Sequence, residues 1–232
     1  VNALQAAHVD GASPFFGHVA PASALMGHSM GGGASVLGAA GNSTIQALVS
    51  FAPAETNPSA VAAAANVLVP TMVFAASEDC VAPIADHQGP IYTALTVPCR
   101  AFVNIQGGGH CYFAESNFNC SFGELTCGPD LTISRGQQHA VMNDFAGLWL
   151  DHYLKGDQQA LPAVLDSLAN STRVQTEFTC LSTDLAEHSE GNWSIGVVAD
   201  DQLLLPNLLP STFATVFDGT GRQVLAVKNV AA

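Results

Sequence analysis

The chain has 232 residues, of which 48% are hydrophobic and 11% are charged, a balance typical of a soluble globular protein with one main domain. Six Lys and Arg oppose 19 Asp and Glu, so the formal net charge is -13. The few basic residues form no cluster, and we expect no nucleic acid as a partner because a phosphate backbone would be repelled.

The first 180 residues alternate predicted strands with predicted helices. Strands are expected in short apolar segments, several of them rich in β-branched residues, at residues 23–26, 45–52, 71–76 and 100–105. Between 133 and 154, apolar residues recur at steps of three and four, as a helix that covers a sheet requires. This alternation predicts an α/β fold with a mainly parallel sheet and helices on both of its faces.

The longest apolar stretch, residues 59–76, does not have the pattern of a membrane span, because Asn66 and Pro70 interrupt it. We interpret it as the end of an alanine-rich helix, a loop and a buried strand.

Residues 27–31 read Gly-His-Ser-Met-Gly and match the G-x-S-x-G pattern between an expected strand and an expected helix. A serine at the tip of so tight a turn takes a strained conformation, and glycine is expected on both sides because side chains there would collide with strand and helix. Ser29 is therefore the candidate nucleophile. The N–H of Met30, at the start of the helix, is the candidate oxyanion donor. The alternative is an ordinary glycine-rich turn.

Candidate acid and base residues follow in the order that the α/β-hydrolase fold uses. Asp79 comes after an apolar strand and is the candidate acid, because ligand chemistry gathers at the C-terminal ends of parallel strands. Glu78 and Asp86 compete for this role, and any of the three is alternatively a surface carboxylate. His110 ends a Gly-Gly-Gly-His run after the next strand, and we interpret this run as a flexible loop that carries the general base.

The other histidines fit the role of the base less well. His28 lies inside the serine turn, and His87 follows an acidic turn. His139 and His152 fall on the long helix. A zinc hydrolase is a third interpretation, since the chain has eight histidines, but no HxxH or HExxH spacing supports it. We therefore expect neither a metal nor another cofactor.

An even set of cysteines without a CxxC pair favours disulfides over zinc and predicts a protein that is secreted or on the cell surface. The six are Cys80, Cys99, Cys111, Cys120, Cys127 and Cys180. The alternative is that they are free thiols in the core.

The positions of the cysteines suggest pairings. Cys80 follows the candidate acid and Cys111 follows the candidate base, so we expect a disulfide between them that joins the two loops. The other expected pairs are Cys120–Cys127 and Cys99–Cys180. Six cysteines allow many pairings, and the sequence does not choose among them.

With these residues in place, the first 180 residues resemble the bacterial α/β-hydrolases of the dienelactone hydrolase, platelet-activating-factor acetylhydrolase and polyester hydrolase (cutinase-like) group. The segments GHSMGGG, PTMVFAASEDCVAP and GGGH carry the resemblance. Position by position, it implies Ser29 as nucleophile, Asp79 as acid and His110 as base. Dienelactone hydrolases use cysteine as the nucleophile, so Ser29 favours an esterase that cleaves short-chain or polyester-type carboxylic esters.

Two departures limit this resemblance. Polyester hydrolases usually place an aromatic clamp just after the segment Phe-Ala-Pro, where this chain has Ala54. Stacking on an aromatic polyester is weaker without that ring, so plastic degradation is not the default expectation. The family also joins acid and base loops by a disulfide, but its cysteines sit at other offsets than Cys80 and Cys111.

The tail of the chain has a different sequence pattern from the first 180 residues. Apolar segments at 213–217 and 224–227 flank a glycine turn, which predicts a β-hairpin in a separate module. The tail resembles the sorting domain of the bacterial type IX secretion system, although Leu208 stands where that family usually has a second proline. We expect an α/β-hydrolase part at 1–180 and a β-rich tail at 181–232, and a plain hairpin is the alternative to a sorting domain.

In this fold the nucleophile normally follows several strands and helices, one of which provides a second oxyanion N–H, whereas Ser29 comes almost at once. We therefore expect a sheet without its N-terminal strands, whose exposed edge invites self-association or a partner that completes it. The leading hypothesis is a serine esterase that forms an acyl-enzyme on Ser29. The alternative is a non-catalytic or weakly active truncated hydrolase that acts as an interaction protein or is a remnant.

Overall fold

The computed structural model describes residues 1–180, 197–199, 202–204, 213–217 and 223–228 of the chain. Contacts divide the chain into two compact units, Val1–Leu181 and Ser182–Ala232.

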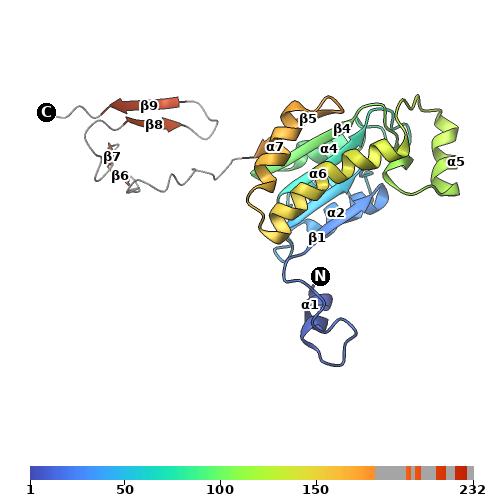
Figure 1. Ribbon diagram of the computed structural model, residues 1–232, viewed down its shortest axis with the longest axis horizontal. Coiled ribbons are helices and arrows are strands. Elements are labelled where there is room, and N and C mark those ends of the chain that lie inside the picture. The colour runs from blue at the N-terminus through green and yellow to red at the C-terminus, as the bar shows by residue number, and fades with distance from the viewer. Residues whose placement is uncertain (181–196, 200–201, 205–212, 218–222, 229–232) are drawn as a thin grey trace. The chain divides into compact units, whose positions relative to one another are not determined.

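A five-stranded sheet of order β1-β2-β3-β4-β5 forms the centre of the first unit (Figure 1). Its strands are β1 (Ala24–His28), β2 (Ala47–Phe51), β3 (Thr71–Ala76), β4 (Cys99–Ile105) and β5 (Val174–Cys180). The first four strands pair in parallel, and β5 is antiparallel to β4. The expected α/β fold with a mainly parallel sheet is confirmed.

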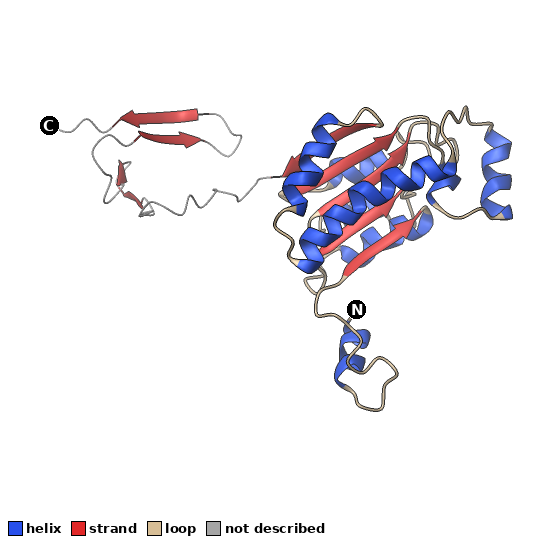
Figure 2. Ribbon diagram, viewed as in Figure 1, coloured by secondary structure: helices blue, strands red, loops and turns tan. Residues whose placement is uncertain are grey.

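Helices cover both faces of this sheet, while α1 and α5 stand away from it (Figure 2). The helices of the first unit are α1 (Asn2–Val9), α2 (Met30–Ala39), α3 (Ala60–Ala64), α4 (Gln88–Ala94), α5 (Phe118–Cys127), α6 (Arg135–Lys155) and α7 (Ala160–Asn170), with a 3-10 helix η1 (His110–Phe113). α6 and α7 pack on one face, and α2, α3 and α4 pack on the other. Every residue of β2 and β3 is buried, which explains why these strands read as continuous apolar runs without alternation.

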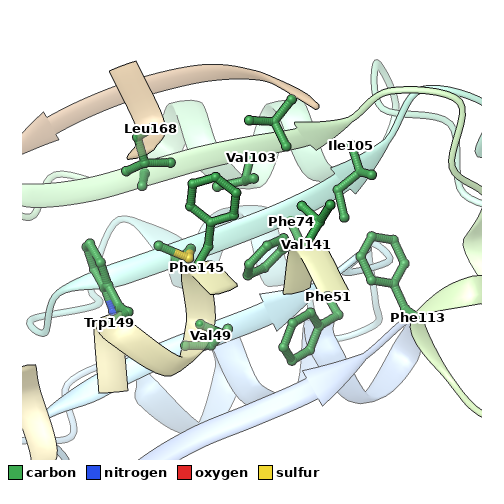
Figure 3. Close-up of a cluster of buried hydrophobic side chains, with 14 of the residues drawn as sticks. Val49, Phe51, Phe74, Val103, Ile105, Phe113, Val141, Phe145, Trp149 and Leu168 are labelled. Carbon is green, nitrogen blue, oxygen red and sulfur yellow. The ribbon is translucent and has the colours of Figure 1, made fainter. Parts of the chain in front are cut away.

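The core on the α6 face is built from residues at helical spacing. Val141, Phe145 and Trp149 recur at steps of four on α6 and point at the sheet, where they meet Phe74 and Val103 (Figure 3). Residues at this spacing share one side of a helix, so the predicted helix at 133–154 buries the face that its apolar pattern indicates.

The apolar stretch at 59–76 divides as the sequence suggested, into α3, a loop and β3. None of the helices in the described residues combines the length and hydropathy that a membrane crossing needs.

The described residues of the second unit form two antiparallel strand pairs. They are β6 (Val197–Ala199) with β7 (Gln202–Leu204), and β8 (Phe213–Phe217) with β9 (Gln223–Lys228). The strands of the expected hairpin are thus confirmed, while its turn and Leu208 lie outside the described residues. The likeness of this tail to a secretion sorting domain stays a prediction.

Candidate active site

The C-terminal ends of three parallel strands bring Ser29, Asp79 and His110 together. Ser29 follows β1 directly, and the other two residues lie in the loops after β3 and β4. His110 Nε2 lies 2.9 Å from Ser29 Oγ, and His110 Nδ1 lies 2.7 Å from Asp79 Oδ2. A neutral imidazole has one donor and one acceptor, so Nδ1–H donates to the carboxylate and Nε2 accepts from the hydroxyl. The three side chains form one continuous hydrogen-bonded chain.

The backbone of Ser29 is strained, with φ 57° and ψ -123°, a conformation that residues other than glycine rarely adopt. Two backbone hydrogen bonds hold it. The Ser29 N–H donates to the carbonyl oxygen of Phe51 at 3.0 Å, and the Ser29 carbonyl accepts from the Ala54 N–H at 2.9 Å. The end of β2 therefore fixes the turn that presents the hydroxyl.

The glycines of this turn have different roles. A Cβ added to Gly27 would lie 2.1 Å from the carbonyl oxygen of Gly31, so position 27 requires glycine. A Cβ on Gly31 would meet nothing within 4 Å, so the expectation that side chains would collide on both sides is wrong for this position. Another close approach is at Gly33, where a Cβ would lie 2.3 Å from the carbonyl oxygen of Ala54.

Asp79 is buried, and its second oxygen is held by the backbone. Asp79 Oδ1 accepts the N–H of Val81 at 3.1 Å and that of Ala82 at 2.7 Å. These bonds leave Oδ2 aimed at His110. The competing carboxylates lie elsewhere, since Glu78 accepts from the neighbouring Ser77 hydroxyl and Asp86 is exposed.

Buried polar side chains fix the backbone around His110, which is only 2% exposed. Gln138 on α6 accepts the N–H of Gly109 at 3.0 Å and donates to its carbonyl at 2.9 Å. Glu124 on α5 accepts the N–H of Cys111 at 3.1 Å. The sequence suggested a flexible loop here, whereas all three glycines are buried, and Gly108 and Gly109 leave room for the close approach of Gln138 and Glu124.

His28 supports the same segment from the opposite side. Its ring centroid lies 4.7 Å from that of His110, and its Nε2 lies 3.0 Å from the His110 carbonyl oxygen. Burial and the neighbouring His110 ring lower the pKa of His28 from 6.5 to about 4. The imidazole is therefore neutral at pH 7, and its Nε2–H donates to the carbonyl.

The disulfides differ from two of the three expected pairs. The structure joins Cys80 to Cys127 and Cys111 to Cys120, and so the predicted Cys80–Cys111 and Cys120–Cys127 bonds are wrong. Cys120 and Cys127 lie seven residues apart in α5, about 10.5 Å along a helix axis, whereas bridged Cα atoms lie within about 7 Å. The acid and base loops are each bonded to α5 and not to each other.

The third bond joins Cys99 to Cys180, the remaining pair of the sequence-based scheme. It connects β4 to β5, where these two residues are partners in the strand register. All six cysteines are therefore bonded.

Met30 is the first residue of α2, and helix N–H groups at this position have no partner within the helix. The role of its N–H as an oxyanion donor stays a prediction. The Met30 side chain is 71% exposed.

Several residues that support the site have no signal in the sequence. Gln88 on α4 is fully buried and donates from Nε2 to the carbonyls of Pro53 at 3.2 Å and Ala82 at 2.9 Å. It thereby links the loop after β2 to the acid loop. Like Gln138 and Glu124, it is one polar residue in a helix and is recognised only when the tertiary contact is known.

His87, His139 and His152 do not join the three-residue chain. His139 and His152 lie on α6, as expected, and His87 accepts the Glu55 N–H. Within the described residues, no three His, Cys, Asp or Glu side chains gather in a way that could hold a metal.

Comparisons with known proteins found a family model and curated relatives that are similar to this chain. A family model described as PET hydrolase-like matches residues 2–126. Cutinase 1 of Thermobifida cellulosilytica is 33% identical over 88 residues, which cover 38% of this chain and 32% of the relative. The bis(hydroxyethyl) terephthalate hydrolase of Streptomyces coelicolor is 33% identical over 87 residues, or 37% of this chain and 27% of the relative. The chain spans about a third of the length of the curated relatives it matches.

Proposed function

The chain belongs to the PET hydrolase-like family, and we propose that it is a serine carboxylic-ester hydrolase that forms an acyl-enzyme on Ser29. The observation that carries this proposal is the bonded chain from Ser29 Oγ through the His110 ring to Asp79 Oδ2. A hydroxyl, an imidazole and a carboxylate in this order are the parts of a nucleophilic triad.

In the first half of the reaction, Ser29 Oγ attacks the carbonyl carbon of the ester while His110 Nε2 takes the hydroxyl proton. Asp79 keeps Nδ1 protonated and stabilises the imidazolium that forms. The Met30 N–H donates to the oxygen that becomes negative. When the intermediate collapses, His110 returns the proton to the departing alkoxide, which leaves as an alcohol.

In the second half, a water molecule attacks the acyl-enzyme and gives its proton to His110 Nε2. Collapse of the second intermediate releases the carboxylic acid and returns the proton to Ser29 Oγ. The proposed reaction needs no cofactor, because every proton and electron pair is exchanged among the ester, the water molecule and the three side chains.

Esters of flexible, mainly aliphatic acids are the substrate class that we favour within this proposal. The names of the relatives, cutinase and bis(hydroxyethyl) terephthalate hydrolase, refer to ester substrates of those proteins. Ala54 bonds to the Ser29 carbonyl and so lies beside the nucleophile. Its methyl group gives an aromatic acyl group no ring to stack on at this position.

We also propose that the protein works outside the cytoplasm. Three disulfides use all six cysteines, and such bonds persist mainly in oxidising compartments.

Hydrolysis of p-nitrophenyl butyrate tests the proposed activity. We expect Ser29→Ala to lower kcat/KM by about 10³-fold or more, since removal of a triad nucleophile costs at least this much in related chemistry. The exposed Ser43→Ala is the matched control and should keep the parent rate.

A fluorophosphonate probe gives an independent readout. The parent protein should be labelled on Ser29, as located by peptide mass spectrometry, and the Ser29→Ala protein should not. A parent protein that neither labels nor hydrolyses the ester would support the non-catalytic alternative instead.

A further inference from the structure

The inner side of α5 is fixed to the two loops that carry the candidate acid and base. Cys127 is bonded to Cys80, the residue after Asp79, and Cys120 is bonded to Cys111, the residue after His110. The buried Glu124 lies between these two anchors in the helix and accepts the Cys111 N–H. Figure 1 shows α5 beyond the arrowhead ends of the parallel strands, where the candidate site lies.

The opposite side of α5 is apolar and exposed. Phe118, Phe122 and Leu125 recur at steps of four and three, so they share one side of the helix. Their exposed fractions are 81%, 58% and 76%. The two phenyl rings stack on each other, with centroids 6.0 Å apart and planes at 22°. We call these three residues the α5 outer face.

The two disulfides hold α5 in an unusual orientation, with its apolar side facing solvent. A surface helix normally turns its apolar side to the core, whereas two disulfides on the opposite side hold the α5 outer face toward solvent. A helix cannot rotate about its axis while it is bonded at two points two turns apart. The disulfides therefore fix the exposure of this apolar side. Contiguous exposed apolar residues mark interaction surfaces.

We propose that the α5 outer face docks on the apolar surface of a polymeric ester and holds that surface beside Ser29. This inference rests on the proposed esterase function and adds to it a surface that recognises polymer. Its place follows from the crosslinks, because any material bound to α5 is next to the loops of Asp79 and His110.

Charge favours a neutral polymer over the other possible occupants. α5 contains neither Lys nor Arg, its one charged residue is the buried Glu124, and the whole chain carries -13. A second copy of the chain or an anionic lipid surface would meet this negative field and be repelled. A neutral polyester surface meets no such repulsion, and it offers alkyl groups to the two phenyl rings and Leu125.

Adsorption to a polycaprolactone film tests the proposal without dependence on catalysis. The full chain with Ser29→Ala would be compared with the same protein that also carries Phe118→Ser, Phe122→Ser and Leu125→Ser. We expect the association constant for the film to fall by about 10-fold or more, because three apolar side chains no longer leave water on binding. Phe118→Ser alone, at the most exposed of the three positions, should show a smaller loss of adsorption.

A matched control removes three exposed apolar side chains from elsewhere on the surface. Val9, Phe16 and Leu68 are 75%, 53% and 63% exposed, and the triple Ser variant at these positions should adsorb like the parent. In the active protein, the α5 variant should keep its kcat/KM on soluble p-nitrophenyl butyrate within about twofold, while its rate on the film falls with adsorption.

Three outcomes would overturn the proposal. The first is unchanged adsorption of the α5 variant, and the second is an equal loss of activity on film and soluble ester. The third is a parent protein that sediments as a dimer and an α5 variant that sediments as a monomer, since a second copy of the chain would then be the occupant. Failure of the esterase function is a separate result, because it appears as unchanged hydrolysis by Ser29→Ala and leaves the adsorption measurement valid.

Discussion

Gln138 shows how one buried side chain can hold the peptide next to a catalytic candidate. Its amide matches both polar groups of Gly109, accepting the N–H and donating to the carbonyl. A Cβ at the neighbouring Gly108 would lie 2.4 Å from Gln138 Oε1, so the glycine run and the glutamine fit together. The position of His110 therefore depends on α6 as well as on its own strand.

Replacement of Gln138 by Met keeps the approximate volume and removes both hydrogen bonds. We expect the free energy of unfolding to fall by about 2–4 kcal/mol, because two buried backbone groups of Gly109 lose their partners. We also expect kcat for p-nitrophenyl butyrate to fall more than KM changes, since displacement of the imidazole affects the transition state. Urea unfolding and steady-state kinetics measure the two effects.

Gln158→Met is the control for this prediction, because Gln158 donates to the carbonyl of Gly156 at an exposed position. It should change the free energy of unfolding by less than about 0.5 kcal/mol. Equal effects of the two substitutions would contradict the role assigned to Gln138.

The three residues of the candidate site could be predicted from the sequence, and the residues that support them could not. Ser29, Asp79 and His110 stand in short motifs at the ends of apolar strands, so local pattern and chain order were enough to select them. Gln138 and His28 bond to the backbone near His110 from other elements. Contacts of this kind depend on packing between segments distant in sequence, which leaves no local pattern to recognise.

Among the elements, β5 was missed although its sequence carries a signal. In Val174–Cys180, partly or fully buried residues alternate with exposed ones, the pattern of an edge strand. β2 and β3 are buried on both faces and read as apolar runs, so a search for such runs passes over β5. The wrong cysteine pairs have a similar origin, because proximity was judged along the chain and the helix α5 was not expected.

The disulfides should differ in what they stabilise. Cys99–Cys180 spans 81 residues and Cys111–Cys120 spans nine, for which chain entropy gives about 4.5 and about 2.6 kcal/mol. We expect the Ser pair at 99 and 180 to lower the free energy of unfolding more than the Ser pair at 111 and 120. Urea unfolding of the two variants measures this order.

Activity should follow the reverse order at temperatures where both variants are folded. Cys111 is next to His110, so loss of its bond to α5 should lower kcat/KM, whereas Cys99 lies at the far end of β4. A variant at 99 and 180 that loses more activity than the variant at 111 and 120 would refute this assignment.

At the scale of the whole molecule, the residues of the candidate site and of both core clusters belong to the first unit, Val1–Leu181. Its last strand, β5, ends at Cys180 and is bonded there to β4. We therefore expect a chain ended after Leu181 to keep the urea midpoint of the first unit. Its kcat/KM for p-nitrophenyl butyrate should stay within about twofold of the full chain, since Ser29, Asp79 and His110 keep their surroundings.

A second truncation, after Arg173, gives this prediction its contrast. It removes β5 together with Cys180, which exposes the β4 edge and frees Cys99. We expect this shorter chain to unfold at a lower urea concentration and to aggregate through the open edge. If the chain ended after Leu181 behaved like the one ended after Arg173, the boundary at residue 181 would not separate independent units, and residues 182–232 would be required for the fold of the hydrolase part.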